Sequence, residues 1–254
     1  ADVTIDPLRD AENIFLEMVF SDLGIVERRL IKIKESFKAT KTQEREILMR
    51  EHTFLQRVKE KLDDGIAIKD QHLTNDEIKL ISGFGFLSMK PLIIVMNIGE
   101  NQLEEKPTLE ETLSTSVSGE RTRTTVICAQ LEMELAQMDH TDEQEFRKNL
   151  STGDSSLKQM IQISYDVVDQ ISFFTVGKDE VRAWEIHRGT VAQKAAGKIH
   201  SDLERGFIRA EVIPYEQLVQ CGGLVEARKS GLLRQEGKSY VLNDGEIMHV
   251  LFNV

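Results

Sequence analysis

The sequence predicts a mixed fold in which an α/β part with a parallel sheet is followed by a smaller α+β domain. Two short apolar runs, 91–97 and 124–128, are separated by a helical stretch, as in parallel sheets that are covered by helices. From Ile171 onward, short β runs alternate with glycines and brief helical pieces. That change is typical of a compact α+β domain, and it places a boundary near residues 168–171.

The amino-acid composition is that of a soluble globular protein, because 40% of the residues are hydrophobic and 30% are charged. No apolar run approaches the ~20 residues of a membrane span, and the N-terminus does not resemble a signal peptide. Cys128 and Cys221 are too few for a disulfide framework. We therefore expect a cytoplasmic protein that has no membrane partner.

The charge is unevenly distributed along the chain. The net charge of −11 argues against a general nucleic-acid binder. Residues 27–62, however, contain eleven Lys and Arg against six Asp and Glu, an excess of +5. One basic segment in an acidic chain marks a candidate contact for an anionic partner.

The N-terminal third predicts a helical hairpin. Asp6-Pro7 begins the first helix, because Asp can cap a helix and Pro suits its first turn. Apolar residues then recur every three or four positions as far as Phe37, and again between Thr42 and Leu62. Asp63-Asp64-Gly65 ends the second helix. Two helices with such narrow apolar seams predict an antiparallel pair.

The outer faces of this hairpin hold the basic excess. The candidate RNA contacts on it are Arg28, Lys32, Lys34 and Arg45. The alternative is a solvated helical surface without a partner.

The remaining elements follow from capping and periodicity. A capping box at Thr74–Glu77 begins a helix. An acidic helical stretch links the two apolar strands, and helices follow near 131–138, 142–150 and 155–169. In the α+β part we expect strands at 171–176, 181–187, 207–213, 239–242 and 247–252, with helices near 190–199 and 215–221.

The first strand ends in Asn97-Ile98-Gly99-Glu100, where open α/β sheets bind their ligands. GTPases carry Asn-Lys-x-Asp at this place, and the Asp accepts two donors of guanine. Glu100 is longer and moves its carboxylate away, whereas an Asn amide can bond the N6/N7 edge of adenine. The tetrad predicts a purine-binding site that recognises guanine less strongly than the Asn-Lys-x-Asp tetrad of GTPases does. An ordinary strand end is the alternative.

The second strand ends in Cys128-Ala129, followed by Gln130-Leu131-Glu132. This resembles the Ser-Ala-x-x-Glu turn of GTPases, whose backbone packs against the base, with Cys128 in place of Ser.

A longer match lies near the C-terminus, in Ala195-Ala-Gly-Lys-Ile-His-Ser-Asp-Leu-Glu-Arg-Gly-Phe-Ile-Arg-Ala-Glu-Val212. It continues in Phe174-Thr-Val-Gly, in Glu180-Val-Arg-Ala-Trp184 and in the terminal Phe252-Asn253-Val254. These residues resemble the TGS-domain signature of the YchF / Obg-like ATPase family. The sequence departs from it at Gln193-Lys194, where the family has Pro-Gln.

The resemblance implies a TRAFAC P-loop NTPase. It implies a partial P-loop G domain with a parallel sheet, a coiled-coil hairpin inserted in it, and a ubiquitin-like β-grasp TGS domain. The corresponding division of the chain is 1–26 (end of the first part of the G domain and start of the helical arm), 27–72 (coiled-coil hairpin insertion), 73–169 (base-recognition part) and 170–254 (TGS domain).

The resemblance also implies a function, the hydrolysis of ATP in preference to GTP by a monomer that associates with the ribosome and its RNA. Asn97 would hold the adenine edge, and the backbone of Ile98 would face the base. Cys128 and Ala129 would close the pocket. Glu100 replaces the Asp that reads guanine, and Ile98 replaces the Lys that stacks on it.

The phosphate-binding half of such a site does not occur in the sequence. There is no Gly-x-x-x-x-Gly-Lys-Ser/Thr, which in the family cradles the phosphates and helps to hold Mg²⁺. We expect those elements to precede Ala1 in a full-length protein that uses Mg²⁺ with ATP or GTP. The chain itself is then expected to hold no catalytic residue and no metal ligand, and to be inactive alone.

Other chemistry is weakly indicated. The six histidines are scattered without metal-ligand spacing. His200 and Asp202 could be an acid/base pair or a turn-stabilising pair.

A basic-aromatic surface for RNA could instead be formed by Arg182, Trp184, Lys198, Arg205 and Arg209, of which Lys198 and Arg205 are the candidate ribosome contacts. The alternative is a core Trp184 with solvated arginines. A non-enzymatic RNA or ribosome adaptor and a GTP-dependent switch remain the rival functions.

Overall fold

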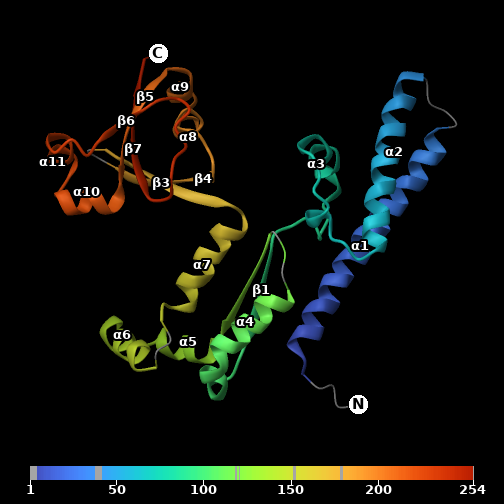
Figure 1. The fold of residues 1–254 in the computed structure, drawn as a ribbon, viewed down its shortest axis with the longest axis horizontal. Helices are drawn as coiled ribbons and strands as arrows, with labels where there is room; N and C mark the ends of the chain where they lie inside the picture. The colour runs from blue at the N-terminus through green and yellow to red at the C-terminus, as the bar shows by residue number, and fades with distance from the viewer. Residues whose placement is uncertain are drawn as a thin grey trace. The chain divides into compact units, whose positions relative to one another are not determined.

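The computed structural model describes residues 5–37, 42–117, 119, 121–150, 153–177 and 180–253 (Figure 1). The chain forms two compact units, Ala1–Ile163 and Ser164–Val254. The division falls within one helix, a few residues before the boundary that the sequence predicts.

The first unit contains the helices α1 (Pro7–Ser36), α2 (Thr42–Asp63), η1 (Ile68–Asp70), α3 (Asn75–Ile81), η2 (Ser82–Phe84), η3 (Glu100–Glu105), α4 (Lys106–Ser116), α5 (Ala129–Leu135) and α6 (His140–Asn149), with strands β1 (Leu92–Asn97) and β2 (Thr122–Ile127). Helix α7 (Ser156–Val167) crosses into the second unit. That unit contains β3 (Gln170–Val176), β4 (Val181–His187), α8 (Ala192–Ile199), α9 (Ser201–Arg205), β5 (Phe207–Pro214), α10 (Tyr215–Cys221), α11 (Leu224–Lys229), β6 (Arg234–Glu236) and β7 (Glu246–Phe252).

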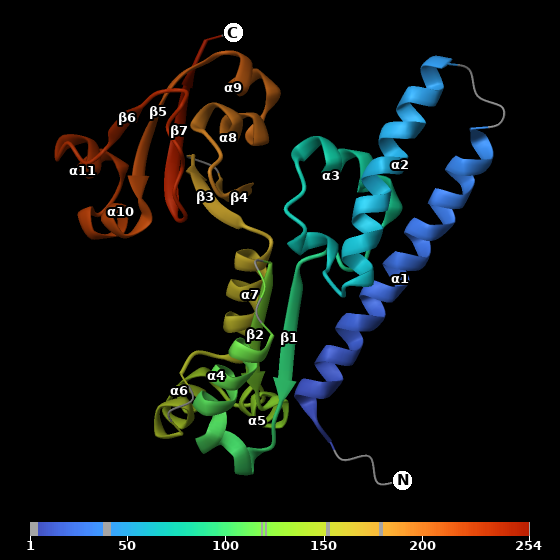
Figure 2. The ribbon, with the colours of Figure 1, turned by 45° about the vertical axis from the view of Figure 1, so that its right-hand side comes forward.

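Helices α1 and α2 form the predicted antiparallel hairpin, and they lie side by side in Figures 1 and 2. The side chain of Asp6 accepts a hydrogen bond from the backbone N–H of Arg9, which confirms the predicted cap. The apolar seams are buried, for example Val26 against Leu55 and Val58 in one core cluster. The break between the helices, residues 38–41, lies outside the described residues.

The base of the hairpin is held by a buried carboxylate. Asp22 is fully buried in α1 and accepts hydrogen bonds from the backbone N–H groups of Leu87 (2.8 Å) and Ser88 (2.7 Å). The hydroxyl of Ser88 in turn accepts from the N–H of Ile68 at 3.1 Å. These bonds satisfy polar groups that would otherwise be costly to bury, and they join α1 to the chain between α3 and β1.

The first unit contains a parallel pair, β1 and β2, in which Leu92 is opposite Thr122 and Asn97 is opposite Ile127 (Figure 2). This confirms a parallel sheet. The continuous apolar run at 91–97 predicts a strand that is buried on both faces. That prediction is wrong, because Val95 is 39% exposed and its neighbours in β1 are half-buried. Within the described residues β1 pairs only with β2, and the apolar cluster of Ile98, Leu113 and Val126 covers part of this sheet.

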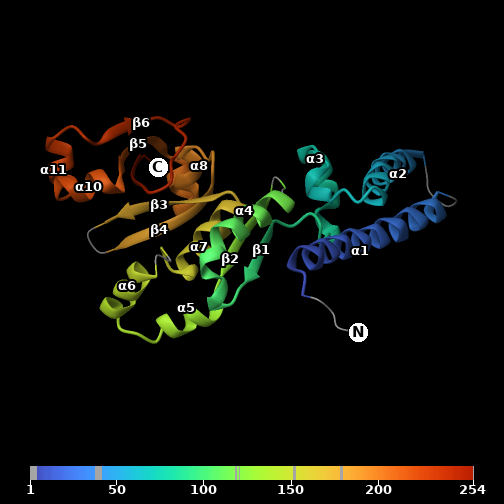
Figure 3. The ribbon, with the colours of Figure 1, turned by 60° about the horizontal axis from the view of Figure 1, so that its bottom comes forward.

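The second unit is a five-stranded sheet in the order β4-β3-β7-β5-β6. Figure 3 shows two of its neighbouring strands, β3 and β4, side by side. The first and last strands of the unit, β3 and β7, pair in parallel, and the other neighbours pair antiparallel. Helix α8 buries Ala192, Ala195 and Ala196 in the cluster that contains Phe173 and Met248. A second cluster joins Ile213 and Ile247 of the sheet to Ala227 of α11.

The edge of this sheet differs from the sequence prediction. Residues 239–242 do not form a strand, and only an isolated bridge joins Val191 to Val241. The edge strand is instead β6, whose Arg-Gln-Glu sequence lacks the apolar alternation that predicts strands. The short helices α9 and α11 were also not predicted. None of the described helices is both long enough and apolar enough to span a bilayer.

Candidate functional site

The carboxyl ends of β1 and β2 meet at one edge of their sheet, because the two strands are parallel and in register. The backbone N–H of Ile98 donates to the carbonyl of Ile127 at 2.8 Å, so the pairing continues one residue past β1. The two turns that the sequence singles out, 97–100 and 128–129, therefore lie next to each other. Ligands of open α/β sheets bind at such an edge.

A side chain joins the two turns. The amide oxygen Oδ1 of Asn97 accepts a hydrogen bond from the backbone N–H of Ala129 at 3.0 Å. Because that N–H can only donate, the oxygen must face it, and this orients the whole carboxamide. Asn97 is exposed, so both N–H donors of its Nδ2 remain available to a ligand. The sequence alone did not indicate this bond.

Ile98 and Cys128 turn inward. Both side chains are buried, with exposures of 6% and 4%, and they belong to the apolar cluster that contains Leu113 and Val126. The side chain of Ile98 therefore packs in the core and leaves only its backbone at the turn. Cys128 precedes α5, and its carbonyl accepts from the N–H of Glu132. Burial of these two residues fixes the position of the exposed Asn97 and Ala129.

Glu100 begins the 3₁₀-helix η3 and is exposed. The turn before it is closed by Gln102, whose Oε1 accepts from the N–H of Gly99 at 3.2 Å. Glu100 lines a cavity of about 740 Å³ together with Glu104, Lys106 and Glu110, so this side of the turn is acidic. The Gly-x-x-Gln spacing is the sequence signal that could have predicted the closure of the turn.

Beyond the turn, α5 is fixed to α6 by Arg147. Its guanidinium bonds Glu132 at 3.0 and 2.8 Å and Glu143 at 2.8 Å. The hydrogen bond from Arg147 holds the pKa of Glu132 below its usual range, although partial burial opposes this. The same pairing raises the pKa of Arg147. These bonds hold the helix that starts at Ala129.

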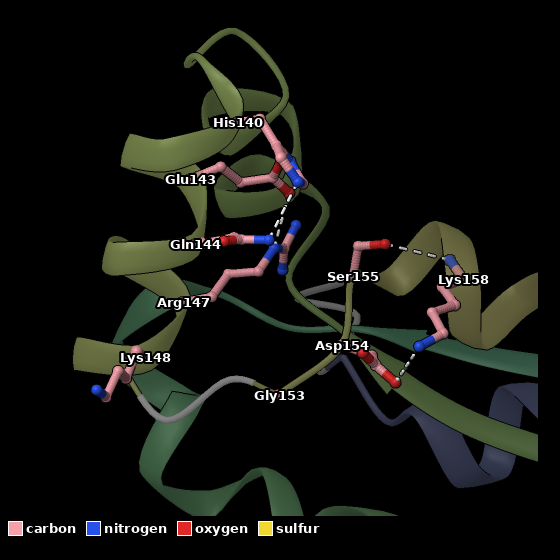
Figure 4. Close-up of a pocket in the computed structure, with 9 residues that line it drawn as sticks. All are labelled: His140, Glu143, Gln144, Arg147, Lys148, Gly153, Asp154, Ser155 and Lys158. Carbon is pink, nitrogen blue, oxygen red and sulfur yellow. Dashed lines mark hydrogen bonds and ion pairs between the residues drawn. The ribbon is translucent and has the colours of Figure 1, made fainter. Parts of the chain in front are cut away.

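Arg147 also lines a cavity of about 580 Å³ between α6 and the start of α7. Figure 4 shows Glu143 and Arg147 pointing toward each other, and Lys158 reaching Asp154, with which it forms a 3.0 Å ion pair. His140 lies 3.1 Å from Gln144 in the same cavity. Because these polar groups contact one another, we assign this cavity no ligand.

The basic residues predicted on the hairpin are exposed. Arg28, Lys32, Lys34 and Arg45 form no ion pair with any described residue. Their neighbour Arg29 instead bonds the buried Glu51 at 2.7 and 2.8 Å, and this raises the pKa of Arg29. The four candidates are thus available to a partner, whereas Arg29 is structural.

The two candidate ribosome contacts in the second unit, Lys198 and Arg205, have different surroundings. Lys198 is exposed, but Arg205 is paired with Asp202. His200 caps α9 by accepting from the N–H of Asp202 at 3.2 Å, which is a turn-stabilising arrangement.

The basic-aromatic candidates of the second unit also have partners. Trp184 packs against the core and donates to Thr175 at 2.9 Å, while the guanidinium of Arg182 lies 4.2 Å from its ring centre. Arg209 contacts Gln235 at 2.6 Å.

Among the described residues, no group of three or more His, Cys, Asp or Glu side chains is placed to hold a metal ion.

The fold and the paired turns define an α/β protein with a candidate ligand site at the carboxyl ends of two parallel strands, a helical hairpin and an α+β second domain. Residues 170–253 match the family model YchF-GTPase_C, described as "Protein of unknown function (DUF933)". The chain is 34% identical over 252 residues to the ribosome-binding ATPase YchF of Bacillus subtilis (strain 168), covering 98% of this chain and 68% of the relative.

Two further relatives agree. The ribosome-binding ATPase YchF of Haemophilus influenzae is 34% identical over 250 residues, with 98% and 68% of the two chains covered. The solved structure of the Schizosaccharomyces pombe YchF GTPase matches with a TM-score of 0.81 at 28% identity, over 99% of this chain and 68% of that one. The chain belongs to the YchF family.

Proposed function

We propose that this chain is the base-recognition part of a ribosome-associated P-loop NTPase that hydrolyses ATP in preference to GTP. The observation that carries the proposal is the 3.0 Å bond from the N–H of Ala129 to Asn97, which joins the two turns into one surface. The names of the relatives, ribosome-binding ATPase and GTPase, support the reaction class.

The oriented Asn97 explains how a purine is read. Its oxygen faces Ala129, so its Nδ2 donors face outward, where they suit the N7 acceptor of a purine. The backbone of Ile98 faces the base, and Cys128 and Ala129 close the pocket. Glu100 stands where GTPases have the shorter Asp that accepts two guanine donors. The N7 contact is common to both purines, and the preference for ATP rests on the replacement of the Asp that selects guanine.

The chain also divides into domains that fit such a protein. We assign 1–72 to the end of the first part of a G domain and its coiled-coil hairpin, 73–169 to the base-recognition part, and 170–254 to a ubiquitin-like β-grasp TGS domain. Support for the last assignment comes from a sheet whose first and last strands, β3 and β7, pair in parallel at its centre, with α8 packed on one face.

The partners follow from the exposed cations and from the names of the relatives. We propose that a monomer contacts the ribosome and its RNA in the cytoplasm through Arg28, Lys32, Lys34 and Arg45 of the hairpin. Lys198 and Arg205 are the second candidates, although Arg205 must first leave Asp202. A non-enzymatic RNA adaptor would use the same surfaces, and a GTP switch the same base site.

The test is equilibrium binding of fluorescent ATP and GTP analogues to a full-length protein that contains this chain. Asn97→Ala should weaken both nucleotides by about tenfold, because the turn loses its cross-strand bond and the base loses its donor. Asn101→Ala, a neighbouring exposed change outside the bond, is the matched control. Equal affinities for Asn97→Ala and the parent protein would refute the base site, and a preference for GTP would favour the switch.

A further inference from the structure

A separate cavity of about 390 Å³ lies between the segment that leads from α2 into α3 and the residue before β2. Three basic side chains line it: Lys69, His72 and Arg121. The remaining lining is apolar and consists of Ile68, Leu73, Ile78 and Met89. The base-recognition turns are at the opposite ends of β1 and β2, because Arg121 precedes the first residue of β2 and Asn97 ends β1.

Lys69 is buried in the wall of this cavity, with its side chain only 3% exposed. Its ammonium donates to Oγ1 of Thr122 at 2.7 Å and lies 3.4 Å from a carboxylate oxygen of Asp70. An ammonium has three donors, so one remains without an acceptor among the described residues. Gly119 makes room for it, because a Cβ at that position would lie 2.9 Å from Nζ. A buried cation with an unused donor suits an anionic ligand.

His72 and Arg121 add two further donors. His72 has a backbone φ of +49°, a left-handed conformation that is uncommon for residues other than glycine. Such conformations are retained where the surrounding structure requires them, often at ligand sites. Both side chains are exposed, and within the described part of the chain neither makes a hydrogen bond or an ion pair.

The charge of the cavity contrasts with that of the chain. Lys69 and Arg121 are cations, and Asp70 is the carboxylate in contact with Lys69. The protein as a whole carries −11. A local positive excess beside an apolar wall suits a ligand with an anionic end and a flat apolar end. Arg binds phosphate oxygens through its planar fork, and Lys binds them as a point charge.

We propose that this cavity binds a phosphate monoester that carries a flat apolar group. Lys69, His72 and Arg121 hold the phosphate oxygens, and Leu73, Ile78 and Met89 contact the apolar group. The site is distinct from the base-recognition turns and does not depend on the proposed NTPase function.

The experiment is a titration of the 254-residue protein with phenyl phosphate, benzoate and phenol, followed by amide chemical shifts in two-dimensional NMR. Phenyl phosphate should cause saturable shifts at Lys69, His72, Leu73 and Arg121. Benzoate, with one charge and two oxygens, should bind about tenfold more weakly, and phenol should not bind.

Two variants leave the buried Lys69 intact and so avoid a folding failure. Arg121→Gln, and His72→Asn, which tolerates a positive φ, should each weaken phenyl phosphate by about tenfold. Lys79→Gln, an exposed change on α3 outside the cavity, is the control and should bind like the parent protein. Shifts confined to other segments, equal binding of phenol or benzoate, or no loss in Arg121→Gln would each refute the site.

Discussion

Asn97 and Asp22 each use side-chain oxygens to join segments that are distant in the sequence. Asn97 bonds the turn after β2, and Asp22 bonds the chain that leads into β1. Asp22 is fully buried, whereas Asn97 is exposed. The bond of Asn97 therefore chiefly shapes a surface, and the bonds of Asp22 chiefly stabilise the fold.

Asp22→Ala should lower the free energy of unfolding by roughly 2–4 kcal/mol, because one buried and one partly buried N–H group lose their acceptor. Urea unfolding followed by circular dichroism measures the change. Glu12→Ala, an exposed change on the same helix, is the control and should lie within about 0.5 kcal/mol of the parent protein. A loss no larger than that of the control would mean that water replaces the carboxylate.

Glu100→Asp should shift the nucleotide preference of a full-length protein toward GTP. A shorter carboxylate can approach both guanine donors, and a bidentate pair discriminates by about 1–3 kcal/mol, or at least fivefold. Competition binding with ATP and GTP measures the ratio. Glu104→Asp, which lines the same cavity, is the control. An unchanged ratio would remove Glu100 from the base site. Ile98 is left intact, because a Lys there would enter the core.

At the scale of elements, α5 and α6 are held together by the charges of Glu132, Glu143 and Arg147. Charged hydrogen bonds of this kind are stronger than neutral ones, and the guanidinium is only 11% exposed. Because Ala129 is the first residue of α5, the pairing of Glu132 with Arg147 also helps to hold the turn at Ala129 in place.

The Glu132–Arg147 pair predicts an acid-sensitive contribution to stability. The pKa of Glu132 is lowered by Arg147 in the folded state, so its contribution is complete above the unfolded pKa of about 4.3 and is lost as pH falls through the lower folded value. The stability gap between the parent protein and Glu132→Gln should therefore be largest near neutral pH and should shrink below about pH 4. Urea unfolding across pH tests this.

The matched control for that pH series is Glu134→Gln. Glu134 lies on the same helix but accepts from the neutral side chain of Gln130 at 2.6 Å, and no arginine in the described part of the chain forms an ion pair with it. Its stability gap should be small and nearly independent of pH. A pH-independent gap for Glu132→Gln as well would mean that the pair does not determine the acid response.

The basic residues of the hairpin formed by α1 and α2 lead to a further prediction. Reversing Arg28, Lys32, Lys34 and Arg45 to Glu should weaken ribosome co-sedimentation and make it less dependent on salt, by roughly three units of the logarithmic slope. Nucleotide binding should be unaffected, and stability should barely change, because these charges are exposed and unpaired among the described residues.

Reversing Lys229 and Lys238 of the second unit controls for added negative charge. Unchanged sedimentation of the hairpin variant across a salt series would contradict the hairpin contact. Loss in a Lys198→Glu variant would then move it to the second unit.

At the scale of the whole molecule, the chain combines two compact units and spans 68% of the length of the relatives it matches. Its sequence contains no P-loop. The 254-residue protein should therefore show no ATP or GTP hydrolysis above background, because its sequence lacks the P-loop that positions the phosphates of a nucleotide for attack. A phosphate-release assay with both nucleotides and Mg²⁺ tests this. Turnover that persists through further purification would contradict it.

The sequence by itself determined the elements whose pattern is local. The two apolar seams predicted α1 and α2, Asp6 and Thr74 predicted the N-caps of α1 and α3, and the 195–212 run identified the family. These predictions succeeded because helix periodicity and capping depend on residues within one or two turns. The two turns of the candidate base site were instead indicated by the ends of the apolar runs and by their resemblance to GTPase motifs.

Only the tertiary structure decided the contacts between distant residues. The edge strand β6, the half-exposed β1 and the bond between Asn97 and Ala129 depend on which strands become neighbours. The cavity at Lys69 likewise forms only when η1 reaches the start of β2. No local sequence pattern predicts these contacts, because pairing and burial across long separations are set by the packing of the whole unit rather than by local propensity.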